Sequence, residues 1–221
     1  MLNKFREYWP ENFWFYPKTY LLPEDEQKLE KKIKNGGVFI AKPSVGCQGD
    51  GICLIRKITD IPKISNSEWI VQPYIDKPLL LGGKKFDLRL YVLISSVSPY
   101  ICYLNEEGLA RFCVEDYQPP TKQNFSNPYI HLTNYSLNKN HPEFVNSETA
   151  YSKGAKRCLK VVWEELRANG VDVCAVRSKI EELTQKFLTG IYPFLKYYYN
   201  ATFPKKDGQC FHVLGIDILL D

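Results

Sequence analysis

The segment KFDLRLYVLISS, residues 85 to 96, constrains the fold more than any other part of the chain. Apolar and polar residues alternate along it, which is the pattern of a β-strand with one buried face. Its apolar face carries Phe86, Leu88, Leu90 and Val92, and its polar face carries Lys85, Asp87, Arg89 and Tyr91. The polar stripe either faces solvent or lines a site, and a charged stripe on a central strand needs partners because an unpaired buried charge is costly.

The elements around this strand predict an α+β fold. Further strands are expected at 37–42, 51–56, 68–75 and 211–221, with a hairpin formed by 99–105 and 108–115 around Glu106–Gly108. Helices are expected at 24–34, 155–170 and 173–200, the last with a bend near Gly190 and Pro193. Strands come first, helices follow and a strand closes the chain, so we expect mainly antiparallel pairing rather than alternating βα winding.

Composition narrows the classes of protein. The chain has 221 residues, 44% hydrophobic and 14% aromatic, which excludes a disordered protein. A net charge of +4 favours acidic partners weakly and does not indicate nucleic-acid binding. Seven cysteines without C-x-x-C spacing indicate reduced thiols, and three histidines make a zinc site unexpected. Neither a signal-peptide core nor an apolar run of membrane-spanning length is expected, so no membrane insertion is predicted.

A glycine-rich loop joins two expected strands within KPSVGCQGDGICLI, residues 42 to 55. Its glycines, at 46, 49 and 51, permit close approach to a ligand, and Lys42 at its root could bind an anion. The spacing is neither that of a P-loop nor that of a dinucleotide-binding turn. A plain hairpin and a mobile lid over phosphates both remain open.

Two further segments carry polar groups of interest. HLTNYS, residues 131 to 136, is either a polar turn or a helix start capped by Asn134 or Ser136. Asp217 lies within the apolar stretch LGIDILL, where a buried carboxylate requires a partner or a metal ion.

Taken together and in their order along the sequence, these segments resemble a known family. The stretches AKPSVGCQGDGI, VQPYIDKPLLLGGKKFDLRLYVL, EGLARFC, HLTNYSLNK and LGIDILLD resemble the ordered motifs of the tubulin tyrosine ligase-like family, within the ATP-grasp superfamily. GCQGDGI and LTNYS are most similar to its glutamate-adding branch, the tubulin polyglutamylases. The resemblance implies an ATP-grasp-like α+β fold of mainly antiparallel sheets with flanking helices, incomplete at the C-terminus. It divides the chain into an aromatic N-terminal linker (1–35), a central lobe with a lid hairpin (36–75) and a truncated C-terminal lobe (76–221).

The resemblance also implies a reaction. Enzymes of this superfamily use ATP and Mg²⁺ to convert a carboxylate into an acyl phosphate, which an amine then attacks. The expected substrates are free L-glutamate and the acidic tails of tubulin, and the expected protein is a cytoplasmic monomer on microtubules, cilia or basal bodies. Glycine or tyrosine ligation by the same family is one alternative. A non-catalytic nucleotide- or tubulin-binding fragment is another, because family members have a glutamate and an asparagine beyond the strand of Asp217, whereas this chain ends at Asp221.

Site residues follow from the same resemblance. The expected ATP contacts are Lys42, Gln48, Gly49, Gln72, Pro73, Tyr74, Ile75, Lys85, Phe86, Asp87, Thr133 and Asn134. Among these, Lys42 and the Gln48–Gly49 peptide would meet phosphates, residues 72–75 would form the adenine hinge and Asp87 would lie near the ribose. Catalysis would depend on Arg89 at the transferring phosphate and Arg111 at a carboxylate of the incoming amino acid. Glutamate would also contact Tyr135, Ser136 and Lys156, although Lys156 is equally a solvated lysine in a first helical turn. Asp217 would bind Mg²⁺.

Overall fold

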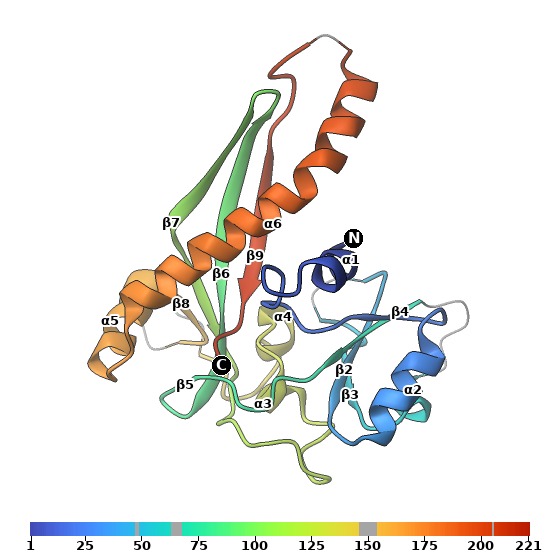
Figure 1. Ribbon diagram of the computed structural model, residues 1–221. Helices are drawn as coiled ribbons and strands as arrows, with labels where there is room; N and C mark the ends of the chain where they lie inside the picture. The colour runs from blue at the N-terminus through green and yellow to red at the C-terminus, as the bar shows by residue number, and fades with distance from the viewer. Residues whose placement is uncertain (47–48, 63–67, 146–153, 205) are drawn as a thin grey trace. The chain divides into compact units, whose positions relative to one another are not determined.

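A computed structural model describes residues 1–221 except 47–48, 63–67, 146–153 and 205. Antiparallel sheets with flanking helices confirm the predicted ATP-grasp-like α+β class (Figure 1). The chain forms two compact units, each described by itself. Unit 1 comprises Met1–Tyr16, Leu88–Ala110 and Arg157–Ile218, and unit 2 comprises Pro17–Asp87, Arg111–Lys156 and Leu219–Asp221.

A four-stranded antiparallel sheet forms the first part of unit 2. Its strands, in spatial order, are β1 (Tyr20–Leu22), β4 (Trp69–Pro73), β2 (Phe39–Pro43) and β3 (Cys53–Ile55). Alternate residues of β2 and β4 are buried and share a core with Leu29 of helix α2 (Glu26–Lys34). Because successive side chains of a strand point to opposite faces, Lys42 and Gln72 lie on the face away from that core.

The rest of unit 2 contains short elements and the ends of two long strands. These are η1 (Ile58–Asp60), β5 (Leu80–Leu81), the start of β6 (Lys84–Val97), the end of β7 (Tyr100–Phe112), α3 (Pro128–His131), α4 (Tyr135–Asn138) and the first residue of β8 (Lys156–Cys158). Phe86 and Phe112 are almost fully buried and stack with ring centroids 5.2 Å apart. Their strand neighbours, Asp87 and Arg111, therefore point away from this aromatic pair.

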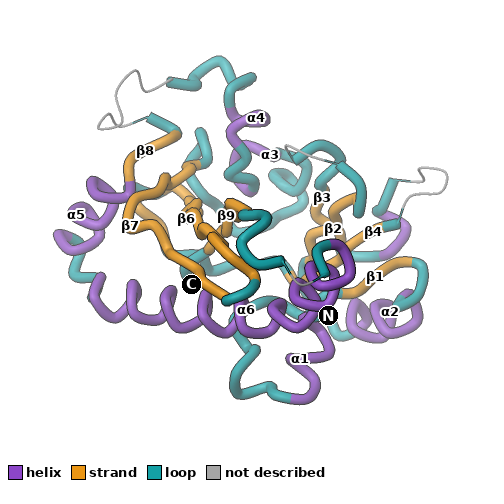
Figure 2. Tube along the Cα trace, turned by 90° about the horizontal axis from the view of Figure 1, so that it is seen from above, coloured by secondary structure: helices purple, strands orange, loops and turns teal. Residues whose placement is uncertain are grey.

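Unit 1 packs a long helix against the remainder of the β6 and β7 strands. The long helix is α6 (Val173–Thr202), and the other elements are α1 (Leu2–Tyr8), α5 (Leu159–Ala168) and β9 (His212–Ile218). Strand β9 runs antiparallel to β6 and places Asp217 opposite Arg89. Val92 and Ile94 of β6 share a core with Leu188 of α6, which runs along these strands (Figure 2). The apolar face predicted for residues 86–92 is buried throughout, as expected.

The expected hairpin around Glu106–Gly108 is wrong. Strand β7 runs unbroken through these residues, and the chain reverses instead between β6 and β7, at Ser98–Pro99. Gly108 lies inside the strand, where an added Cβ would be 2.5 Å from the carbonyl oxygen of Arg89. This glycine permits a close approach of two strands rather than a turn.

The expected helix at 155–170 begins later than predicted. Residues Lys156–Cys158 form strand β8, and helix α5 starts at Leu159. The backbone N–H of Phe112 donates to the carbonyl of Ala155 at 2.8 Å, so this segment is held against the end of β7. The interpretation of Lys156 as a lysine in a first helical turn is therefore wrong. Helix α6 continues through Gly190 and Pro193, and Gly190 leaves room for the ring of Phe5, 2.9 Å from where a Cβ would lie.

Candidate functional site

Lys42 is held in place by neighbouring side chains of unit 2. Its Nζ donates to Gln72 Oε1 at 3.0 Å, and Gln72 Nε2 donates to the hydroxyl of Thr19 at 2.9 Å. The register of β2 and β4 pairs Ile40 with Gln72 and so brings the two polar side chains together. An ammonium placed in this way on a sheet face can bind a phosphate.

The glycine-rich loop approaches Asn134. Gly49 has a φ of +88°, and a Cβ added there would lie 2.8 Å from Asn134 Cγ and 3.0 Å from Leu137 Cδ1. Only glycine tolerates both the backbone conformation and the contact. Cys47 and the predicted ligand Gln48 lie outside the described residues. The role of this loop as a lid stays a prediction.

The predicted hinge, residues 72–75, includes the end of strand β4. Pro73 is the last residue of the strand, and the N–H of Tyr74 donates to the carbonyl of Val38 at 2.9 Å. The Tyr74 side chain is buried, whereas Pro73 and Ile75 are half-buried. An adenine ring that binds at this edge of the sheet would therefore need a backbone donor other than Tyr74 N–H.

Asp87 is the centre of a compact polar cluster. It accepts from Arg111 Nε at 2.9 Å and Nη2 at 2.5 Å, and from the hydroxyl of Thr133 at 2.8 Å. The side chains of Asp87 and Arg111 are only 12% and 13% exposed. The structure therefore joins three predicted site residues from β6, β7 and the segment after α3, and it gives Arg111 a carboxylate partner within the chain.

Two cations predicted to bind ligands occupy different environments. Lys85 is buried and donates to the Tyr74 hydroxyl at 3.0 Å, and burial lowers the pKa of its ammonium to about 8. Lys156 Nζ lies 4.8 Å from the centre of the Tyr135 ring, a cation–π contact. The backbone N–H of Phe112 donates to the carbonyl of Ala155. Arg111 is the residue before Phe112 and Lys156 is the residue after Ala155, so both cations are next to this hydrogen bond.

The predicted motif 131–136 is held by a residue that the sequence analysis missed. Asn138 is fully buried, accepts from the N–H of Val114 at 3.0 Å, and donates to the carbonyls of Leu132 and Asn134 at 2.8 and 2.9 Å. The two carbonyls lie on either side of Thr133. Asn134 occupies the position before helix α4, but its side chain makes no capping bond, and Ser136 lies within that helix. The only sign of this role in the sequence is the asparagine itself, six positions after Leu132.

Arg89 and Asp217 form a separate pair in unit 1. Arg89 Nε and Nη2 both donate to the carboxylate, the latter at 3.0 Å. The Asp217 side chain is 46% exposed, so the expectation of a buried carboxylate is wrong. The arginine side chain lies over Gly215, where an added Cβ would be 3.3 Å from Arg89 Cδ. The glycine two residues before Asp217 makes room for this contact.

The described residues do not fit a complete Mg²⁺ site. Within the described ranges no three His, Cys, Asp or Glu residues gather closely enough to hold a metal ion. Asp217, the predicted ligand, is paired with Arg89, whereas Mg²⁺ prefers oxygen ligands in near-octahedral arrangement.

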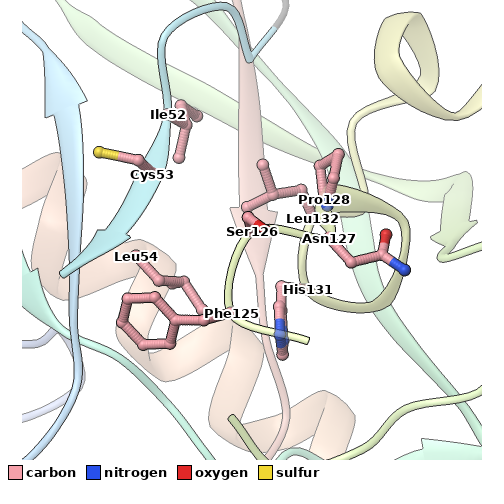
Figure 3. A pocket seen from close by; sticks show the side chains of 9 residues that line it. All are labelled: Ile52, Cys53, Leu54, Phe125, Ser126, Asn127, Pro128, His131 and Leu132. Atoms are coloured by element: carbon pink, nitrogen blue, oxygen red, sulfur yellow. The ribbon is translucent and has the colours of Figure 1, made fainter. Parts of the chain in front are cut away.

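An apolar pocket of about 200 Å³ lies beside α3 in unit 2. Figure 3 shows its lining, contributed by β3 with the residue before it and by residues 125–132. The lining residues are Ile52, Cys53, Leu54, Phe125, Ser126, Asn127, Pro128, His131 and Leu132. None of the predicted ligand contacts is among them.

Comparison with known proteins agrees with these motifs. All of residues 1–221 match the tubulin-tyrosine ligase family. The tubulin polyglutamylase TTLL11 of Mus musculus is 42% identical over 96% of this chain and 31% of its own length. Tubulin polyglutamylase TTLL7 of Mus musculus is 40% identical over 96% of the chain and 24% of its own length. A probable beta-tubulin polyglutamylase of Tetrahymena thermophila is 36% identical over the whole chain and 19% of its own length. The chain thus spans less than a third of these relatives.

Proposed function

The chain belongs to the tubulin-tyrosine ligase family, and we propose that it forms the nucleotide- and amino-acid-binding part of a ligase that adds glutamate to tubulin. The relatives described above are named tubulin polyglutamylases, which supports glutamate over glycine or tyrosine. The observation that carries the proposal is the arrangement of unit 2. Two sets of polar side chains are ordered there by hydrogen bonds: Lys42 of β2 with Gln72 of β4, and Asp87 of β6 with Arg111 of β7 and Thr133.

In the proposed reaction, a side-chain carboxylate of the tubulin tail attacks the γ-phosphorus of ATP. An acyl phosphate forms and ADP leaves. The α-amino group of free glutamate then attacks the acyl carbon, phosphate departs, and an isopeptide bond results. Family membership suggests that ATP and Mg²⁺ are required. Bound Mg²⁺ would supply charge neutralisation at the phosphates.

We assign the side chains of unit 2 to two tasks. Lys42 and Lys85 hold phosphates, and Asp87 and Thr133 orient the nucleotide, with the remaining predicted contacts retained as proposals. Arg111 binds a carboxylate of the incoming amino acid, because its planar guanidinium matches a carboxylate in two parallel bonds. Lys156, with Tyr135 beneath it, binds the second carboxylate of glutamate. Arg89 and Asp217 of unit 1 are retained as proposals for the transferring phosphate and the metal.

The domain ranges and the setting are also proposals. We assign 36–75 to the central lobe and 76–221 to the C-terminal lobe of an ATP-grasp enzyme. Through its substrate, the protein would associate with microtubules and the cytoskeleton. None of the helices in the described parts of the chain combines the length and apolar character that a membrane span requires.

The test uses the intact protein that carries this chain. Radiolabelled glutamate should be incorporated into microtubules in an ATP-dependent reaction, with glycine and tyrosine assayed in parallel. With an ¹⁸O-labelled tail carboxylate, one labelled oxygen should appear in the inorganic phosphate released, as an acyl phosphate requires. Incorporation of glycine instead of glutamate would assign the protein to the glycylating class. ATP binding without any incorporation would favour a non-catalytic binding module.

A further inference from the structure

Lys85 is the first member of a buried chain of hydrogen-bonded side chains in unit 2. Its Nζ donates to the Tyr74 hydroxyl at 3.0 Å, and that hydroxyl lies 3.0 Å from His131 Nδ1. The other ring nitrogen, His131 Nε2, lies 3.2 Å from the backbone carbonyl of Asn124. Lys85, Tyr74, His131 and Asn124 are only 5%, 8%, 2% and 7% exposed. The proposed ligand contacts give no role to His131 or Asn124.

The direction of each hydrogen bond follows from the last acceptor of the series, the carbonyl of Asn124. A carbonyl can only accept, so His131 Nε2 carries the proton in its bond to Asn124. Burial lowers the pKa of His131, which makes the neutral ring the relevant form and leaves Nδ1 as an acceptor. Tyr74, whose pKa is raised chiefly by burial, keeps its proton and donates it to Nδ1. Its oxygen lone pairs are thereby turned towards the Lys85 ammonium.

Asn124, at the far end of this hydrogen-bonded series, is fixed by its own contacts. The Asn124 side chain accepts from the N–H of Thr121 at 2.7 Å and donates to the carbonyl of Pro119 at 3.0 Å. These bonds hold the loop that presents the Asn124 carbonyl. The His131 ring is also edge-on to the rings of Tyr74 and Tyr117. Its orientation is therefore set from both sides.

The surroundings of the ammonium explain why it needs such support. Lys85 Nζ lies 4.2 Å from the centre of the Tyr74 ring and 5.9 Å from that of Tyr117, so aromatic faces replace much of its water. Burial is the main cause that lowers its pKa to about 8, and the Lys42 charge lowers it further. The Asp87 carboxylate acts in the opposite direction and raises it. Burial raises the pKa of the neighbouring Cys113 thiol to about 12, so this thiol is uncharged where Lys85 titrates. Asp87 is already engaged by Arg111.

We propose that Tyr74 and His131 are positioning residues that hold the Lys85 ammonium in place for an anionic ligand, the phosphates of a nucleotide. The inference rests on the proposed nucleotide function. Neither residue need touch the ligand through its side chain. His131 takes the tyrosine proton, Tyr74 presents its oxygen, and that oxygen stabilises the charged form of Lys85. Without this acceptor, desolvation shifts the lysine towards its neutral form, which binds a phosphate poorly.

The decisive measurement does not depend on enzymatic activity. In the intact protein labelled with ¹³Cε-lysine, NMR titration follows Lys85, whose signal is identified by its loss in Lys85→Arg. Tyr74→Phe should lower the pKa of Lys85 by about one unit, because a hydrogen bond to a charged group is lost. His131→Leu should also lower the pKa of Lys85. His131→Asn is the matched control, because its amide oxygen can accept from Tyr74 near the position of Nδ1, and the pKa should recover.

Binding of a fluorescent ATP analogue ties this shift to the ligand. At pH 7.5, a fall in the pKa of Lys85 from about 8 to about 7 reduces its charged fraction about threefold, so Tyr74→Phe should weaken binding by about that factor. The difference should vanish below pH 6.5, where Lys85 is charged in both proteins. An unchanged pKa in folded Tyr74→Phe, or equal pKa values in the Leu and Asn variants of His131, overturns the inference while the nucleotide function stands. Absence of ATP binding by the unsubstituted protein overturns the nucleotide function and the ligand assigned to Lys85.

Discussion

The Asp87–Arg111 pair makes Arg111→Met the most informative substitution for stability. Both side chains are nearly buried, at 12% and 13% exposure. Removing one partner of a buried ion pair costs about 3–5 kcal/mol, because the remaining charge is left without compensation. The Thr133 hydroxyl still donates to Asp87 in the variant, at 2.8 Å in the present structure. We therefore expect a loss at the low end, about 3 kcal/mol.

A matched control lies on β6, two residues after Asp87. Arg89 pairs with Asp217 in the same two-bond manner, but those side chains are 29% and 46% exposed. Exposed pairs contribute about 0–1 kcal/mol, so Arg89→Met should cost no more than that. The comparison isolates burial, because the chemistry of the two pairs is the same.

Urea unfolding followed by circular dichroism and tryptophan fluorescence measures both losses. If the two units unfold in separate transitions, each variant should shift the transition of its own unit. The double variant Asp87→Asn with Arg111→Met should recover more than half of the loss, since no buried charge is left unpaired. A cost below about 1 kcal/mol for Arg111→Met, or no recovery in the double variant, would refute the argument.

Three further substitutions test other contacts. Gly49→Ala should weaken binding of a fluorescent ATP analogue several-fold more than Gly36→Ala, because both positions have positive φ but only at Gly49 would a Cβ meet Asn134, at 2.8 Å; equal effects would exclude the contact. Gly108→Ala should destabilise unit 1 by about 1–3 kcal/mol in urea unfolding, because its Cβ would overlap a backbone oxygen 2.5 Å away. Lys156→Ala should reduce glutamate use about tenfold relative to glycine in a competition assay, since glycine lacks the second carboxylate; an equal loss of both would show that Lys156 does not read the side chain.

The strand of residues 85–96 shows what sequence periodicity could predict. Alternation identified the buried face, and burial of Phe86 and Leu88 follows directly from it. The same alternation placed Lys85 and Asp87 on the polar side, and both require partners because both are buried. The identity of those partners was not predictable. Arg111 and Thr133 lie 24 and 46 residues from Asp87. Tyr74 follows β4 whereas Lys85 lies on β6, and no alternation pattern encodes such contacts.

Glycines show why some elements were misplaced. In Glu106–Gly108 a turn and a close strand approach have the same local sequence, and only the carbonyl of Arg89 on the neighbouring strand distinguishes them. Gly215 similarly gives no sign by itself that an arginine lies across it. His131 lies in the predicted polar segment and Asn138 lies two residues beyond it, but the burial and the bonds of both depend on tertiary contacts.

Arg111 must serve Asp87 and the proposed substrate together, which leads to a last prediction. Displacing Asp87 would leave that carboxylate with the Thr133 hydroxyl as its described partner, whereas sharing the guanidinium leaves no charge unpaired. A guanidinium can share because it has donors on several edges, but an ammonium on a flexible stem cannot hold two carboxylates in fixed planes. Arg111→Lys should therefore retain more stability than Arg111→Met yet raise the KM for glutamate about tenfold or more, the effect of losing a hydrogen bond to a charged group. Steady-state kinetics at saturating ATP, together with urea unfolding, measure the two quantities. A lysine variant with an unchanged KM would show that Arg111 acts as a simple positive charge and does not grip the carboxylate through two bonds.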